Sequence, residues 1–99
     1  MNDEADEVTS AQDEIEFLRD APVESILGSH IFHLIQLAAV HLAPTPPHLD
    51  EARLCIDVAS AMVNAGGDRL GEHVGLYRNA LAEVQQVFVR ASTSPPTTE

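Results

Sequence analysis

Three histidines lie in one short and otherwise apolar stretch of this sequence, HIFHLIQLAAVH, which covers residues 30–41. Imidazole nitrogens bind transition metals and gain a proton near neutral pH, so such a stretch could hold a metal or respond to pH. On a helix, His30 and His33 lie one turn apart, whereas His41 lies about 16 Å from His30 along the axis. Within this helix, His30 and His33 are therefore the pair that could share one metal ion.

Two histidines supply only half of the ligands that zinc prefers. The missing ligands would have to come from His48, His73, Cys55 or a carboxylate of another chain, and no spacing selects one of them. A metal- or pH-responsive protein would use His30 and His33, together with His41 or His73. The HExxH motif is absent, and so is the Glu-x-x-His motif of di-iron bundles, because Glu72 directly precedes His73. We therefore predict no metal or other cofactor. A histidine-based metal- or pH-responsive binding protein is the alternative function.

No other group of residues forms a recognisable catalytic set. The glycine-rich segment NAGGDRLGEH lacks the Lys that a phosphate-binding loop needs, and Cys55 has no neighbouring base to activate it. Arg53 and Asp57 are four residues apart and can pair across one helical turn. We interpret them as a structural ion pair on the surface. The alternative is that Arg53 binds an acidic residue of a partner chain or of the loop before its own helix. We therefore predict that the protein is not an enzyme.

The overall charge of the chain limits its partners. The formal net charge is −11, with no Lys and only five Arg, so the clustered cations that bind phosphate groups are missing. We therefore expect neither nucleic acid nor an anionic membrane as a partner. The most apolar run, residues 31–43, is shorter than the roughly 20 residues of a membrane-spanning helix, and no leader peptide is recognisable. We expect a cytoplasmic protein.

Proline and glycine divide the chain into four expected helices. Pro22 suits the first turn of a helix, the prolines of APTPPH end that helix, and Gly66–Gly67 end the next one. The expected helices cover residues 11–20, 22–43, 49–65 and 71–91 of a single domain, residues 11–92. The acidic tail at residues 1–10 and the Pro/Thr-rich tail at residues 93–99 are expected to be disordered. No segment alternates as a strand does. We predict an all-α fold, a small bundle of three main helices with a short N-terminal helix.

The expected helix at residues 22–43 is apolar around most of its circumference. One short chain cannot cover so much apolar surface, so we expect this helix to contact a second copy, first of all in a dimer, or another protein. The last expected helix carries a seam of apolar residues at alternating spacings of four and three, which is typical of helix packing. The expected interface residues come from these two helices: Ile26, Phe32, Leu34, Ile35, Leu37, Val40, Tyr77, Leu81, Val84 and Phe88. A non-enzymatic module that self-associates or binds a protein is the leading functional prediction.

Four segments occur in an order that resembles a known family: LAAVHLAP (37–44), LDEARLCID (49–57), NAGGDRLGEH (64–73) and LAEVQQVFVRAS (81–92). The chain resembles, over residues 17–92, the bacterial domain-of-unknown-function family numbered eighteen forty-four, in the form found in high-GC bacteria. The resemblance implies a small, acidic, helical protein with disordered ends and no assigned activity. The family pattern is recognisable at His41, Asp50, Ala52, Arg53, Ile56 and Asp57. Gly71 departs from it, because relatives often have a Ser or Thr helix cap there.

Overall fold

The structure is a computed structural model that describes residues 3–93, with side chains from residue 10 onward. Within residues 3–93 the chain forms four α-helices, one 3-10 turn and no strand, which confirms the all-α prediction. The elements are α1 (Asp3–Asp20), α2 (Val23–Leu42), α3 (Leu49–Gly66), η1 (Gly67–Leu70) and α4 (Val74–Thr93). The expectations for residues 1–2 and 94–99 lie outside the described residues.

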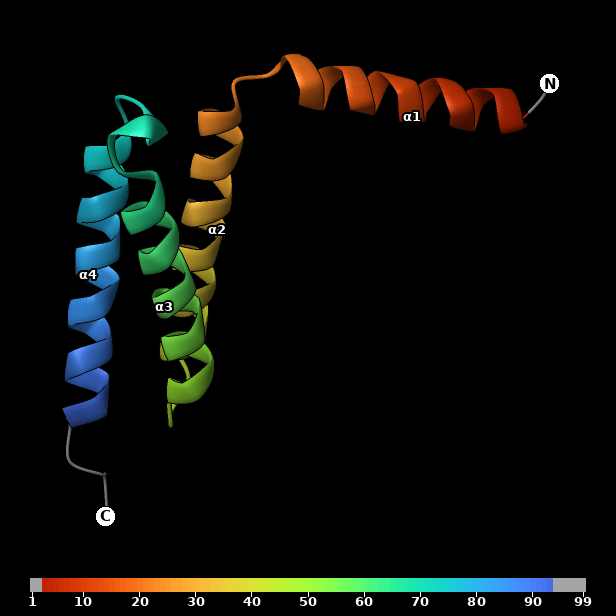
Figure 1. The fold of residues 1–99 in the computed structure, drawn as a ribbon. Helices are drawn as coiled ribbons and strands as arrows, with labels where there is room; N and C mark the ends of the chain where they lie inside the picture. The colour runs from red at the N-terminus through yellow and green to blue at the C-terminus, as the bar shows by residue number, and fades with distance from the viewer. Residues whose placement is uncertain (1–2, 94–99) are drawn as a thin grey trace.

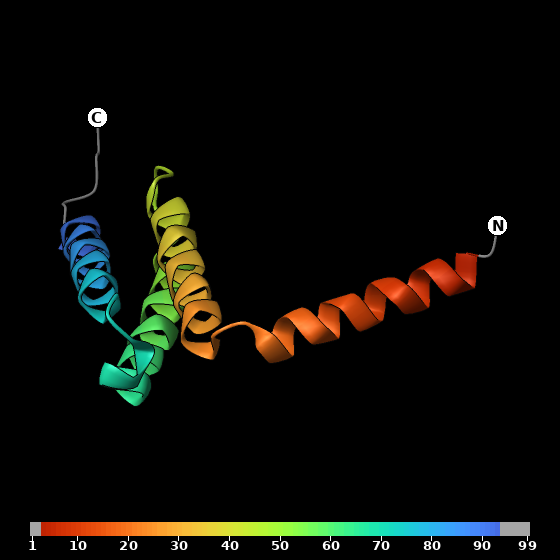
Figure 2. The same ribbon diagram turned by 90° about the horizontal axis from the view of Figure 1, so that it is seen from above.

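Helices α2, α3 and α4 form a three-helix bundle, and α1 leaves it (Figure 1). The two views agree that α1 extends from the start of α2 on the side away from α4 (Figure 2). Every residue from Ser10 to Asp20 is exposed. The change of direction falls at Ala21–Pro22, because Pro22 disfavours a helical conformation in the residue before it and is itself extended, with φ −60° and ψ 122°.

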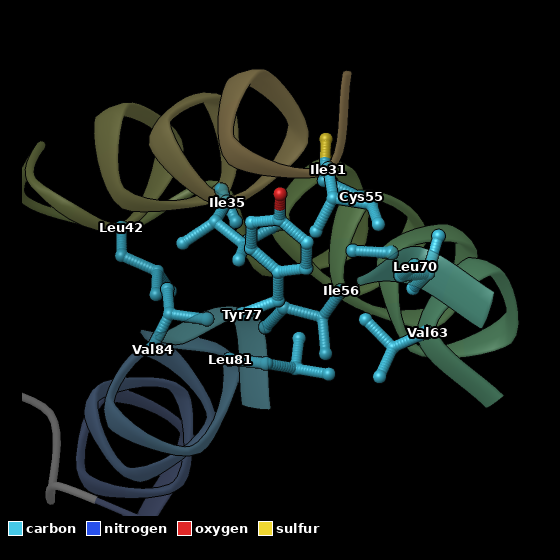
Figure 3. Packing of buried hydrophobic residues seen from close by; sticks show 13 residues of the cluster. Ile31, Ile35, Leu42, Cys55, Ile56, Val63, Leu70, Tyr77, Leu81 and Val84 are labelled. Carbon is cyan, nitrogen blue, oxygen red and sulfur yellow. The ribbon is translucent and has the colours of Figure 1, made fainter. Parts of the chain in front are cut away.

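The bundle has an aliphatic core, because the sequence offers few aromatic side chains. Ile31 and Ala38 of α2 and Ala52 and Ala59 of α3 are fully buried, and the small alanines let α2 and α3 approach closely. Tyr77 of α4 enters this core from the opposite side (Figure 3). The buried side chains therefore come from all three helices and from Leu70 of η1, and residues 10–20 of α1 contribute none.

Two helix starts differ from the expectation. Helix α1 begins at Asp3 rather than at residue 11, so residues 3–10, which were expected to be part of a disordered tail, are helical. Acidic residues favour the first turns of a helix because they interact with its positive end, and the N-terminal sequence is rich in them. Helix α4 begins at Val74 rather than at Gly71, because Gly71 has φ +93° and closes the η1 turn by donating its N–H to the Asp68 carbonyl.

Candidate functional site

One side of α2 is covered by neither α3 nor α4, although Phe17 and Leu18 of α1 line an apolar pocket with Ile26 and His30 near its start. Six residues line it at spacings that alternate between three and four: Val23, Ile26, His30, His33, Leu37 and Val40. Five of these residues are exposed, and Ile26 is half-buried. This row, called the outer seam below, has the spacing of a helix face that packs against another helix over several turns.

The outer seam places His30 and His33 at its centre, between apolar residues at both ends. Both histidines are exposed, as a surface helix position predicts. They come from successive turns of α2, and in the described part of the chain neither donates or accepts a side-chain hydrogen bond. The candidate metal pair of the sequence is therefore a pair of solvent-facing rings on a helix surface.

The structure instead joins His41 to His48, a pairing that sequence reasoning missed. Their Nδ1 atoms lie 2.9 Å apart, and the backbone N–H of His48 donates to the carbonyl of His41 at 2.8 Å. His41 is in the last turn of α2, and His48 directly precedes α3. The three prolines between them stiffen a short loop, and this is the signal that could have indicated that its two ends meet.

The remaining polar candidates lie on the surface. The Nε of Arg53 lies 3.8 Å from a carboxylate oxygen of Asp57, and both side chains are largely exposed. His73 lies in the turn before α4, with its Nε2 atom 3.8 Å from a carboxylate oxygen of Glu72. Cys55 is a free thiol buried in the core. Among the described residues, no three His, Cys, Asp or Glu side chains gather as a metal site would require.

A second uncovered surface is an apolar groove between α2 and α4, with a volume of about 460 Å³. The buried side chains Ile35, Leu42 and Val84 form its floor. Its walls consist of Gln36, Ala39, Ala43, Ala80, Glu83 and Val87. The groove, called the α2/α4 groove below, is open because helix α3 packs on the other side of the α2–α4 pair (Figure 3).

The residues expected at an interface divide into two groups. Ile35, Tyr77, Leu81 and Val84 are buried in the chain's own core, and Leu34 and Phe88 are partly buried against it. These six contribute to packing between helices of one chain. The other four keep accessible surface on α2: Ile26, Phe32, Leu37 and Val40. Phe32 also contacts Tyr77 edge-on, with ring centroids 5.2 Å apart.

Helix α2 also has the length and apolar composition of a membrane-spanning helix. Among the described helices, α2 alone meets both requirements, over Val23–Leu42. The most apolar run of the sequence, residues 31–43, is too short to meet the length requirement. Mostly buried core helices of soluble proteins and signal sequences near an N-terminus meet the same requirements, and only 17% of this span of α2 is buried. In this structure α2 packs against both α3 and α4, and its uncovered side carries two histidines at mid-length.

Comparisons with protein-family models, with curated proteins and with solved structures give no match. The resemblance to the family of bacterial proteins described above therefore stays a prediction.

Proposed function

We propose that this chain is a non-enzymatic helical module that self-associates through the outer seam of α2. The observation that carries the proposal is the symmetry of the seam about its own centre. From either end toward its centre, the outer seam has first a valine, then an isoleucine or leucine, and then a histidine. A second copy laid antiparallel on the seam therefore pairs Val23 with Val40, Ile26 with Leu37 and His30 with His33.

Such a pairing forms a two-fold symmetric interface, in which the same patch of both copies takes part. Apolar residues meet apolar residues at the ends, and histidines meet at the centre, where polar residues in a helix seam fix the register. An antiparallel arrangement also keeps the two acidic N-terminal segments apart. Residues 1–20 hold eight acids and one Arg, and a parallel arrangement would place these segments side by side.

Light scattering and analytical ultracentrifugation of the full chain test the proposal. We expect a dimer at micromolar concentration and a weaker dimer in Val40→Ser. The change occurs twice in each dimer, so a loss of about 1 kcal/mol per copy weakens the association about 30-fold. Val89→Ser is the matched control, because Val89 is 56% exposed on α4 and Val40 is 63% exposed on α2.

Two results would contradict the proposal. One is a wild-type chain that remains monomeric up to about 100 μM, which corresponds to an association free energy too weak for a specific dimer. The other is an equal effect of Val40→Ser and Val89→Ser. Flotation of the chain with phosphatidylcholine vesicles, abolished by Val40→Ser, would instead show that α2 contacts a membrane.

A histidine-based metal-responsive protein is the second candidate, and the His41–His48 contact favours it. Two Nδ1 atoms 2.9 Å apart are close enough to bind one ion as neighbouring ligands, and the end of α2 carries the partial negative charge that favours cations. Water or another chain would supply the other ligands. Calorimetric titration with Ni²⁺ or Zn²⁺ tests this function: binding that His41→Ala abolishes and His73→Ala retains supports it, and no measurable binding contradicts it.

A further inference from the structure

We propose that the corner between α1 and α2 holds the last turn of α2 of the second copy, so that each α1 embraces the other copy of the dimer. An apolar pocket of about 530 Å³, called the corner pocket below, lies in this corner. Phe17 and Leu18 of α1 line one side of it, Ile26 and His30 of α2 line another, and Pro22 lies at the bend. The inference rests on the proposed antiparallel dimer and names a second surface that this dimer buries.

The corner pocket is continuous with the outer seam, because Ile26 and His30 belong to both surfaces. The α2/α4 groove, by contrast, shares no residue with the seam. In the antiparallel pairing, Leu37 of the second copy meets Ile26, and Val40 of the second copy meets Val23. A second α2 that follows the seam therefore brings its last turn into the corner.

The dimensions of the corner match those of a packed helix. Phe17 and Leu18 lie about 6–8 Å from Pro22 along the axis of α1. Both views show that α1 runs outward from the start of α2 and not along it (Figures 1 and 2). The axes of packed helices lie about 8–10 Å apart. A helix that packs on the outer seam therefore comes against α1 at the level of Phe17 and Leu18.

The apolar side chains of α1 at the corner are not covered by the chain's own bundle. Phe17 is 65% exposed and Leu18 is 49% exposed, although both line the corner pocket. Most of the stability of a helix in a protein comes from the packing of its apolar face. A helix that enters the corner would cover both side chains and supply this packing to α1.

The charges of the chain favour the end of α2 as the occupant. Residues 1–20 hold eight acids and one Arg, so α1 repels an acidic surface. Residues 25–49 hold no Asp or Glu and form the longest acid-free stretch of the chain, and they include the last turn of α2 and the loop that follows it. Neither Glu16 nor Asp20, the acids of α1 nearest to the bend, lines the corner pocket. The antiparallel dimer thus places an acid-free segment against the acidic helix.

No other described element of the same chain reaches the corner. Helices α3 and α4 pack on the side of α2 opposite to the outer seam. The loop at residues 43–48 begins at the far end of α2, about 30 Å from Pro22. Helix α4 ends at Thr93 near that same end (Figure 1), and residues 94–99 span at most about 22 Å. The corner therefore stays open in the single chain, and its occupant comes from another molecule.

Ultracentrifugation of full-length variants tests the inference. We expect Phe17→Ser to weaken the dimer by at least about tenfold, because the lost apolar contact occurs twice in each dimer. Ile15→Ser is the matched control and should change the dissociation constant by less than about threefold. Ile15 is 61% exposed, lies about 160° from Phe17 around α1 and does not line the corner pocket. Circular dichroism and urea denaturation show whether both variants keep α1 and the bundle.

Chemical cross-linking of two different variants identifies the occupant directly. A chain with Phe17→Cys is mixed with a chain with Val40→Cys and treated with a short bis-maleimide, which joins exposed thiols that lie close together. We expect a cross-link between the two chains, and much less of it when Ile15→Cys replaces Phe17→Cys. The native Cys55 is buried in the core and serves as the unreactive background. Equal cross-linking from Phe17→Cys and Ile15→Cys would overturn the inference.

The outcomes separate this inference from the proposed function. A wild-type chain that stays monomeric contradicts both. A dimer that Val40→Ser weakens and Phe17→Ser leaves unchanged supports the outer seam and overturns the role of the corner. A dimer that Phe17→Ser weakens and Ile15→Ser does not, with the cross-link to Val40→Cys, supports the corner. Flotation with phosphatidylcholine vesicles that Phe17→Ser abolishes would show that the corner takes lipid, and would overturn the second copy as its occupant.

Discussion

Tyr77 of α4 lies directly against Gly28 of α2, and its ring fills the space where a side chain at residue 28 would begin. A Cβ atom built at Gly28 would lie 2.5 Å from Cζ of Tyr77, closer than van der Waals contact allows. The hydroxyl group of Tyr77 points toward the backbone of α2 (Figure 3). The close approach of α2 and α4 at this level therefore depends on a glycine and an aromatic ring.

In Gly28→Ala the added methyl group forces the ring of Tyr77 out of a packed core, which costs about 1–3 kcal/mol. The gain in helix propensity offsets about 1 kcal/mol of this cost, so we expect the free energy of unfolding to fall by up to about 2 kcal/mol. Urea denaturation measures the change. Gly75→Ala is the control, since nothing lies within 4 Å of a Cβ at Gly75, and it should stabilise the protein. Equal stabilisation by both substitutions would show that Tyr77 does not occupy this space.

The sequence predicted the bundle well because its signals are local. Pro22 and the prolines after Ala43 bracket α2, and Gly66–Gly67 mark the end of α3, so these boundaries depend on backbone chemistry alone. The apolar seam of α4 also runs where the spacing of Tyr77, Leu81 and Val84 placed it. Proline, glycine and helical periodicity act over a few residues, and tertiary contacts did not override them.

The candidate surfaces were harder to predict, because they depend on how helices face one another. The apolar excess of α2 was evident from composition, but its division into a buried side and an outer seam required the positions of α3 and α4. The contact between His41 and His48 depends on the path of the loop between them. The start of α4 was displaced by the η1 turn, which residue spacing alone did not reveal.

The His41–His48 contact should stabilise the junction between α2 and α3. We expect His41→Ala and His48→Ala each to lower the free energy of unfolding by about 0.5–1.5 kcal/mol, the usual contribution of one hydrogen bond. The double variant should lose less than the sum of the two single changes, because both remove the same contact. Urea denaturation of the four proteins measures this coupling. His73→Ala is the control, and strict additivity would show that the two rings do not interact.

Gly67 ends α3 with φ +52°, a backbone conformation that residues with a side chain rarely adopt. Nothing lies within 4 Å of a Cβ at this position, so any effect of Gly67→Ala comes from the backbone and not from a steric contact. We expect the substitution to lower the free energy of unfolding by about 1–2 kcal/mol. Thermal and urea denaturation measure it, and an unchanged stability would mean that Gly67 adopts a negative φ in solution.

The Arg53–Asp57 pair should contribute little to stability. Both side chains are well exposed and their charged atoms are 3.8 Å apart, so water and salt screen the attraction. We expect Asp57→Asn to change the free energy of unfolding by less than about 0.5 kcal/mol. A loss above about 1 kcal/mol that depends on protein concentration would instead indicate that Arg53 or Asp57 contacts another chain.

The histidines at the centre of the outer seam should limit the strength of the dimer. In the antiparallel pairing His33 of one copy faces His30 of the other, and burying polar rings in a helix seam lowers stability while it fixes the register. We therefore expect His33→Leu to tighten the dimer by about tenfold or more, because leucine is preferred at such positions. Ultracentrifugation measures the dissociation constant, with His73→Leu, outside the seam, as the control. A weaker dimer in His33→Leu would mean that His33 makes a favourable contact across the interface, and an unchanged dimer would place the interface elsewhere.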